Sequence, residues 1–135
     1  MNIAHVLLSA GRLNINVYIK GGENMKKIYL FCSDGMSTSM LAKKMQEVGD
    51  NHKLPIEVKA FPIRNLEKII EEKNPDCILL GPQVRHLFDE TKKKLEKYDL
   101  PVGVIDSADY GMMDGEKVLK KSILLMKKHK EKGGK

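Results

Sequence analysis

Four short apolar runs, separated by longer segments of helical character, most constrain the fold of this 135-residue chain. Three of them occupy residues 28–32, 77–80 and 102–105; the fourth, over 56–61, follows the break at Leu54-Pro55 and also contains Glu57 and Lys59. Continuous apolar runs that end at Gly, Pro or polar residues are typical of strands buried on both faces, and such strands form parallel sheets. Each run is therefore predicted to be a strand of one parallel sheet.

The segment after each run carries apolar residues at helical spacing. Helices are predicted from residue 36, over 66–73, over 84–95 and over 118–126. Asn74-Pro75 ends the second helix, and Pro82 suits the first turn of the third. The first helix has an apolar stripe, which we interpret as core packing. Its members are Met36, Met40, Leu41, Met45 and Val48.

Strands that alternate with helices indicate an α/β fold with helices on both faces of the sheet. Right-handed crossovers restrict the topology, so we expect a four-stranded open sheet of order 2-1-3-4, a flavodoxin-like arrangement. Such sheets bind ligands beyond the carboxyl ends of the strands, where the winding reverses. The loops that meet there begin at Cys32 and Gly81. Cys77 opens the third strand and is predicted to belong to the core.

The loop after Cys32 has the features of an anion site. Free backbone N–H groups at a helix N-terminus bind anions, and Gly35 lets them approach a ligand closely. Hydroxyl side chains can donate to phosphate oxygens, and the helix dipole favours a thiolate. A buried structural cysteine followed by a helix cap is the alternative, but the position of Cys32 at a strand's carboxyl end favours a nucleophile. The predicted phosphate-binding residues are Ser33, Asp34, Gly35, Met36, Ser37, Thr38 and Ser39.

Residues 29–39 closely resemble the active-site segment of IIB components of the bacterial phosphotransferase system, in the lactose/cellobiose (chitobiose) class. The similarity continues through residues 57–62, 79–83 and 104–107 and through Tyr110-Gly111. It covers essentially all of residues 25–130 and none of residues 1–24. Four separated segments in the right order make the resemblance specific.

The resemblance implies a phosphorelay in which Cys32 attacks a phosphohistidine on a partner IIA protein. The phosphocysteine then phosphorylates a β-linked disaccharide held by the membrane IIC component, while the loop amides of residues 34–39 bind the phosphoryl oxygens. It implies a cytoplasmic protein, peripherally associated with the permease, that needs no cofactor or metal. We expect the free chain to be monomeric. Gln83, Asp106 and Tyr110, in the loops after the third and fourth strands, are predicted to border the site.

Asp34 departs from the family pattern, which often has a small neutral residue at this position. A carboxylate pointing inward would repel both a thiolate and a phosphate. We expect Asp34 to point to solvent or to cap the following helix.

Two other functions use a similar position in such a fold. A low-molecular-weight phosphatase or arsenate reductase shares a phosphatase-like loop but requires Cys-x5-Arg, because the guanidinium binds the phosphoryl group in flight. Thr38 occupies that position here. A receiver-like module needs an acidic pair after the first strand and a phosphorylatable Asp after the third, where this chain has Gly81-Pro82-Gln83. Both alternatives are weaker.

The net charge of +6 arises from 24 basic and 18 acidic residues. Its Lys-rich patches lack the interleaved Arg and aromatic residues of nucleic-acid-binding surfaces, so we interpret them as solvated helix faces. The apolar runs are too short to span a membrane. The two cysteines and the scattered histidines show no metal or disulfide spacing, although His86 lies near the predicted site.

Residues 1–24 are predicted to be a translated leader or disordered extension, with Met25 as the true start. The segment ends in Lys20-Gly21-Gly22-Glu23, which a purine-rich run resembling a ribosome-binding site can encode. An edge strand over 14–19 is the alternative. Residues 25–130 form the predicted domain, and residues 131–135 a disordered tail.

Overall fold

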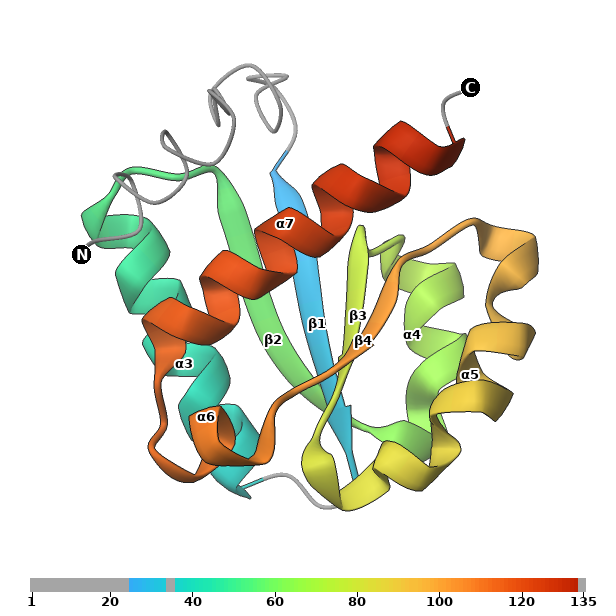
Figure 1. Ribbon diagram of the computed structural model, residues 1–135, viewed down its shortest axis with the longest axis horizontal. Helices are drawn as coiled ribbons and strands as arrows, with labels where there is room; N and C mark the ends of the chain where they lie inside the picture. The colour runs from blue at the N-terminus through green and yellow to red at the C-terminus, as the bar shows by residue number, and fades with distance from the viewer. Residues whose placement is uncertain (1–24, 34–35, 134–135) are drawn as a thin grey trace.

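The computed structural model describes residues 25–33 and 36–133, so the leader and the alternative strand over 14–19 lie outside the described residues. The described chain forms one parallel sheet in the order β2-β1-β3-β4, which confirms the predicted topology (Figure 1). The strands are β1 (Lys26–Cys32), β2 (Ile56–Pro62), β3 (Cys77–Leu80) and β4 (Val102–Val104).

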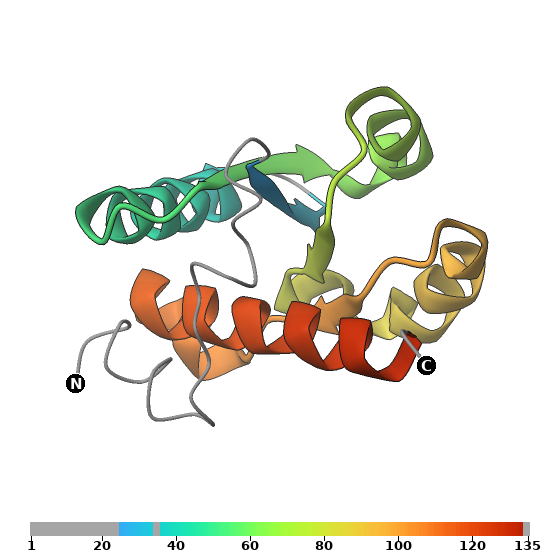
Figure 2. The same cartoon turned by 90° about the horizontal axis from the view of Figure 1, so that it is seen from above.

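Helices pack on both faces of the sheet, as predicted. Helices α3 and α7 cover one face, and α4 and α5 lie on the other (Figure 2). The helices are α3 (Met36–Asn51), α4 (Leu66–Lys73), α5 (Phe88–Lys94), α6 (Ser107–Gly111) and α7 (Gly115–Gly133), and the short 3-10 turns are η1 (Ile63–Asn65), η2 (Pro82–Leu87) and η3 (Glu96–Tyr98).

Strand β1 contributes to two hydrophobic cores because successive side chains of a strand point to opposite faces. Ile28 and Leu30 join the cluster under α3 and α7, whereas Tyr29 and Phe31 join the cluster under α4 and α5. All four are fully buried. Burial of each large apolar side chain stabilises the fold by about 1.5–3 kcal/mol, so β1 is the central support of the Cys32 loop.

Helix α7 meets α3 at a glycine. A Cβ atom on Gly115 would lie 2.8 Å from the backbone carbon of Lys44 and 2.9 Å from the backbone nitrogen of Met45. These are backbone atoms, so no side-chain rotation could make room. The absence of a side chain at residue 115 therefore allows α7 to begin directly against α3.

The third predicted helix, over 84–95, was wrong as a single element. The chain instead forms η2 and then α5, with a break at Val84, whose φ of −118° and ψ of 23° are not helical. The Val84 N–H bonds to the Gly81 carbonyl, three residues back, so the chain turns tightly after β3. This turn keeps η2 close to the carboxyl end of β1.

Two further details differ from the sequence analysis. Met40 is 53% exposed, so the core stripe of α3 is narrower than expected and rests on Leu41 and Met45, both fully buried. Helix α6 was not anticipated, and α7 (Gly115–Gly133) extends beyond the predicted range of 118–126 at both ends. Helix α3 follows the Cys32 loop, and α7 packs against α6.

Candidate functional site

Three loops meet at the carboxyl edge of the sheet, which is the lower edge in Figure 1. Backbone hydrogen bonds hold them together beyond the strands: Gly81 N–H donates to the Phe31 carbonyl at 2.8 Å, and Ile105 N–H donates to the Leu80 carbonyl at 2.8 Å. The loops after β1, β3 and β4 are therefore fixed side by side. This is the arrangement predicted from the reversal of winding.

Cys32 is the last residue of β1, and its side chain is almost fully buried. The Thr38 hydroxyl, on the first turn of α3, donates a hydrogen bond to Cys32 Sγ at 2.8 Å. Tyr110 Oη, from α6, lies 3.0 Å from the same Thr38 hydroxyl. A strand end and two helices thus bring a sulfur and two hydroxyls into one buried cluster.

Gly81 forms the wall of the site on the β3 side. A Cβ atom on this residue would lie 3.1 Å from the Cys32 Cβ and 2.8 Å from Gln83 Oε1. The glutamine side chain is exposed and can move, but Cys32 is held in β1. A side chain at residue 81 would therefore press on the candidate nucleophile, which explains a glycine at this point.

The other predicted loop residues divide into two groups. Ser33, Ser37 and Ser39 are exposed beside the buried cluster, and Met36 begins α3. Asp34 and Gly35 lie outside the described residues, so the orientation of the Asp34 carboxylate stays a prediction.

Of the neighbouring residues, only Tyr110 contacts the Cys32 cluster through a hydrogen bond that the structure describes. Gln83 and His86 are exposed on η2. Asp106 acts instead as the N-cap of α6: its carboxylate accepts hydrogen bonds from Ala108 N–H at 2.8 Å and Asp109 N–H at 3.3 Å. The backbone N–H groups of Asp109 and Ala108 lower the Asp106 pKa below its ordinary value of 3.8.

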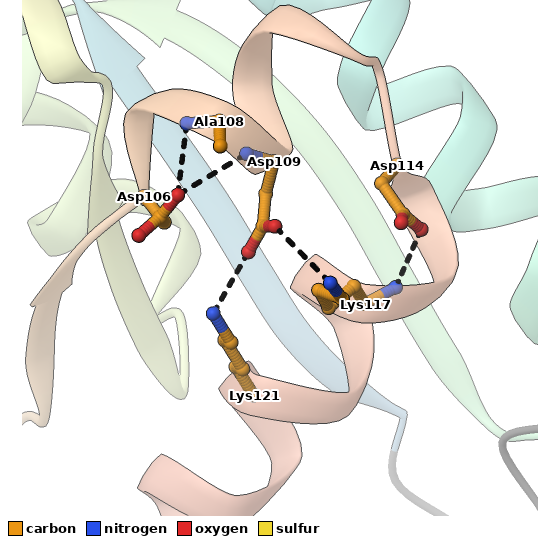
Figure 3. A network of polar contacts seen from close by, with 6 residues as sticks. All are labelled: Asp106, Ala108, Asp109, Asp114, Lys117 and Lys121. Carbon is orange, nitrogen blue, oxygen red and sulfur yellow. Dashed lines mark hydrogen bonds and ion pairs between the residues drawn. The ribbon is translucent and has the colours of Figure 1, made fainter.

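Asp109 connects α6 to α7 (Figure 3). Its carboxylate is buried and lies 2.8 Å from Lys121 Nζ and 3.8 Å from Lys117 Nζ. The hydrogen bond to Asp109 raises the pKa of Lys121. Sequence reasoning missed this pair because α6 is too short to show a periodic pattern; the only available signal was an acidic residue next to Tyr110.

The second cysteine has a different environment. Cys77 is fully buried at the start of β3, opposite Ile28 and away from the carboxyl edge. Burial, and secondarily the nearby Asp76 carboxylate, raises the Cys77 pKa strongly. A thiol that resists ionisation is a poor nucleophile, so Cys77 serves the core.

Residues 27–121 match the family model described as the lactose/cellobiose-specific IIB subunit of the phosphotransferase system (PTS). The chain belongs to this family. It is 40% identical over 102 residues to an oligo-β-mannoside-specific EIIB component from Bacillus subtilis (strain 168), covering 76% of this chain and 97% of the relative. It is 39% identical over 104 residues to a cellobiose-specific EIIB component from Lactococcus lactis subsp. lactis, covering 75% and 96%.

Solved structures of PTS IIB proteins share the fold. The lactose-specific IIB domain from Streptococcus pneumoniae superposes with a TM-score of 0.67 at 19% identity, covering 74% of this chain and 96% of that domain. The cellobiose-specific IIB protein from Borrelia burgdorferi gives a TM-score of 0.65 at 28% identity, covering 78% and 95%. The resemblance found in the sequence is thus confirmed, and the chain is a sugar-specific IIB component of cellobiose/lactose type.

Two further findings concern the described part of the IIB chain. None of its helices is long and apolar enough to cross a membrane. Within residues 25–33 and 36–133, no three His, Cys, Asp or Glu side chains gather in a way that could hold a metal ion.

Proposed function

We propose that this IIB chain is a phosphocarrier in which Cys32 accepts a phosphoryl group from a phosphohistidine of IIA. In this step an S–P bond forms and the N–P bond of the phosphohistidine breaks. The second ring nitrogen of the phosphohistidine carries a proton, so the departing group is a neutral imidazole. The phosphocysteine then donates to a sugar hydroxyl at the membrane IIC component: a sugar O–P bond forms, the S–P bond breaks, and the hydroxyl proton passes to solvent. The sulfur returns to the thiolate.

The observation that carries this proposal is the hydrogen bond from Thr38 to a cysteine sulfur at the carboxyl edge of the sheet. A hydroxyl donor stabilises the anionic sulfur that attacks phosphorus and later leaves it. On this proposal the phosphoryl oxygens bind the N–H groups expected at the start of α3 and the loop amides of residues 34–39, together with the hydroxyls of the exposed residues Ser33, Ser37 and Ser39. Positioning and charge stabilisation account for the rate.

Thr38 also supports transfer rather than hydrolysis. It occupies the sixth position after Cys32, where a phosphatase of this loop type needs Arg to stabilise the phosphoryl group in flight. A neutral hydroxyl leaves that stabilisation to the acceptor protein or its sugar. The phosphoryl group is then retained until the partner arrives.

The partners and substrate follow from the family. We propose a β-linked disaccharide as the acceptor, because the similar relatives are named for an oligo-β-mannoside and for cellobiose. A further relative, from Lactococcus lactis subsp. cremoris, is named for galactose. On this proposal the chain acts in the cytoplasm and associates with the permease only at its surface.

Incubation with phosphorylated IIA, followed by intact-mass measurement, tests the proposal. We expect one phosphoryl group on the unmodified chain, none on Cys32→Ser, and one on Cys77→Ser. Peptide mapping should place it on Cys32. Phosphate found on Cys77, or rapid release of inorganic phosphate without an acceptor sugar, would contradict the phosphocarrier.

A further inference from the structure

The buried hydroxyls beside Cys32 form a chain with a defined direction. We propose that Tyr110 is a positioning residue that acts through Thr38 to stabilise the anionic sulfur of Cys32, and that this hydroxyl relay assists departure of the phosphoryl group. The inference rests on the proposed phosphocarrier function and adds to it a specific role for α6.

The direction of the relay follows from counting hydrogens. Thr38 carries one hydroxyl hydrogen, which it donates to Cys32 Sγ at 2.8 Å. Toward Tyr110, 3.0 Å away, Thr38 can then only accept, so the tyrosine hydroxyl is the donor. A thiolate has no hydrogen of its own to donate. Ionisation of Cys32 therefore fixes both hydroxyls in a single orientation, from Tyr110 to Thr38 to sulfur.

Burial strengthens the two hydrogen bonds of this hydroxyl relay. Thr38 is fully buried, Cys32 is 1% exposed and Tyr110 is 9% exposed. Hydrogen bonds away from water are electrostatically stronger and polarise one another along a chain. Donation from Tyr110 thus makes the Thr38 hydroxyl a better donor to the sulfur.

The relay matters most when charge appears on sulfur. In phosphocysteine the sulfur is bonded to phosphorus and is a weak acceptor; as the S–P bond breaks, the bonding electron pair stays on sulfur. A donor already aimed at this atom stabilises the developing charge without reorganisation. Uptake of the phosphoryl group from IIA depends less on the relay. Without the relay less of the cysteine is ionised, but each thiolate is more nucleophilic, and these two effects on the rate oppose each other.

Helix α6 holds Tyr110 at the required place. Asp106 caps the helix, and Asp109, the neighbour of Tyr110, is bound to Lys121 of α7 at 2.8 Å (Figure 3). The N–H of Tyr110 itself donates to the Asp106 carbonyl at 2.9 Å. The cap at Asp106, just after β4, and the ion pair to α7 therefore both fix the position of the tyrosine hydroxyl.

The test compares Tyr110→Phe with Tyr98→Phe. Both substitutions remove one phenolic oxygen, but the Tyr98 hydroxyl donates to Glu71 at an exposed position outside the cluster. The first measurement is the ultraviolet absorbance of the thiolate during a pH titration, taken as the difference between each variant and the same variant carrying Cys32→Ser. The second is the rate of each half-reaction, from phosphorylated IIA and to the acceptor sugar with IIC.

For Tyr110→Phe we expect the midpoint of thiolate formation to rise by about half a pH unit, and onward transfer to slow roughly two- to tenfold, as for loss of one net hydrogen bond. Phosphorylation by IIA should change less than onward transfer. Thr38→Val should raise the midpoint of thiolate formation further. Thr38→Ser keeps the hydroxyl, so its midpoint should match that of the unmodified chain. Tyr98→Phe should leave both measurements unchanged.

An unchanged titration midpoint in Tyr110→Phe, or equal slowing of both half-reactions, would overturn the relay. If Tyr110→Phe were unfolded, the Thr38→Val and Thr38→Ser pair would decide by the same titration, and identical midpoints for the two would also overturn it. Failure of the unmodified chain to accept phosphate would instead contradict the phosphocarrier, while the titration would still report on the relay.

Discussion

Asp106 contributes to the site through the helix that it caps. It was predicted to border the Cys32 loop, which stays a prediction, and its carboxylate binds the first N–H groups of α6. Side-chain oxygens at an N-cap satisfy donors that have no partner within the helix. The function of Asp106 is therefore to start the short helix that carries Tyr110.

This capping predicts a dependence of stability on acid. Because the Asp106 pKa is lowered in the folded state, its ionised form stabilises the fold above the ordinary value of 3.8, and this contribution is lost as the pH falls through the folded-state pKa. Asp106→Asn keeps a capping oxygen but cannot titrate. Thermal melting should show nearly equal melting temperatures at neutral pH and a weaker decline for Asp106→Asn as the solution is acidified. An identical decline in both chains would refute this assignment.

At the residue scale, the sequence predicted the position of Cys32 but not its partners. The cysteine ends an apolar run, and parallel strands place such an end at the site, so position alone was informative. The bond between Thr38 and Tyr110 joins residues 72 positions apart. No local pattern encodes a contact of that separation, and both residues could be named only as members of loops.

Among the elements of the described chain, β2 is an edge strand of the sheet, and a side chain of α3 binds part of its outer edge. Gln46, on α3, donates to the Ile56 carbonyl at 3.0 Å and accepts from the Val58 N–H at 2.7 Å. Its amide thus imitates the backbone of a neighbouring strand. Unpaired edges invite association with other chains, and this contact stabilises β2 by binding two backbone groups of that edge.

Replacement of Gln46 should expose that edge. Gln46→Ala removes two hydrogen bonds from the β2 backbone, and we expect the free energy of unfolding to fall by about 1–3 kcal/mol. Urea denaturation measures this loss, and faster hydrogen exchange at Val58 N–H would locate it. Gln83→Ala, at an exposed glutamine on η2, is the control and should unfold like the unmodified chain. Equal stability of the two variants would contradict a role for Gln46 at the edge.

The strands and the longer helices were predictable, and helix α6 was not. Strands β1 to β4 were visible as short runs rich in apolar residues, and helices α3, α4 and α7 as apolar residues at helical spacing. Helix α6 has five residues, fewer than two turns, and it depends on a cap and on the Asp109–Lys121 ion pair for its place. The break at Val84 likewise reflects the turn demanded by Gly81 and Pro82, which overrides a continuous helical pattern.

For the whole molecule, the described residues already enclose both faces of the sheet. One core lies under α3 and α7 and the other under α4 and α5. Within residues 25–33 and 36–133, every buried side-chain nitrogen and oxygen has a hydrogen-bond partner. The family match begins at residue 27, and 76% of this chain accounts for 97% of the relative from Bacillus subtilis. The part of the chain that matches the family therefore lies after Met25.

This organisation makes the leader hypothesis testable. A chain that begins at Met25 retains every contact described for the two cores and for Cys32, Thr38 and Tyr110, so we expect it to melt at the same temperature as the full chain. It should also accept a phosphoryl group from IIA at the same rate. Calorimetry and intact-mass measurement compare the two chains directly. A melting temperature lower by several degrees without residues 1–24 would mean that they pack on the domain, because a loss of about 1 kcal/mol shifts the midpoint by roughly 4–8 °C in a domain of this size.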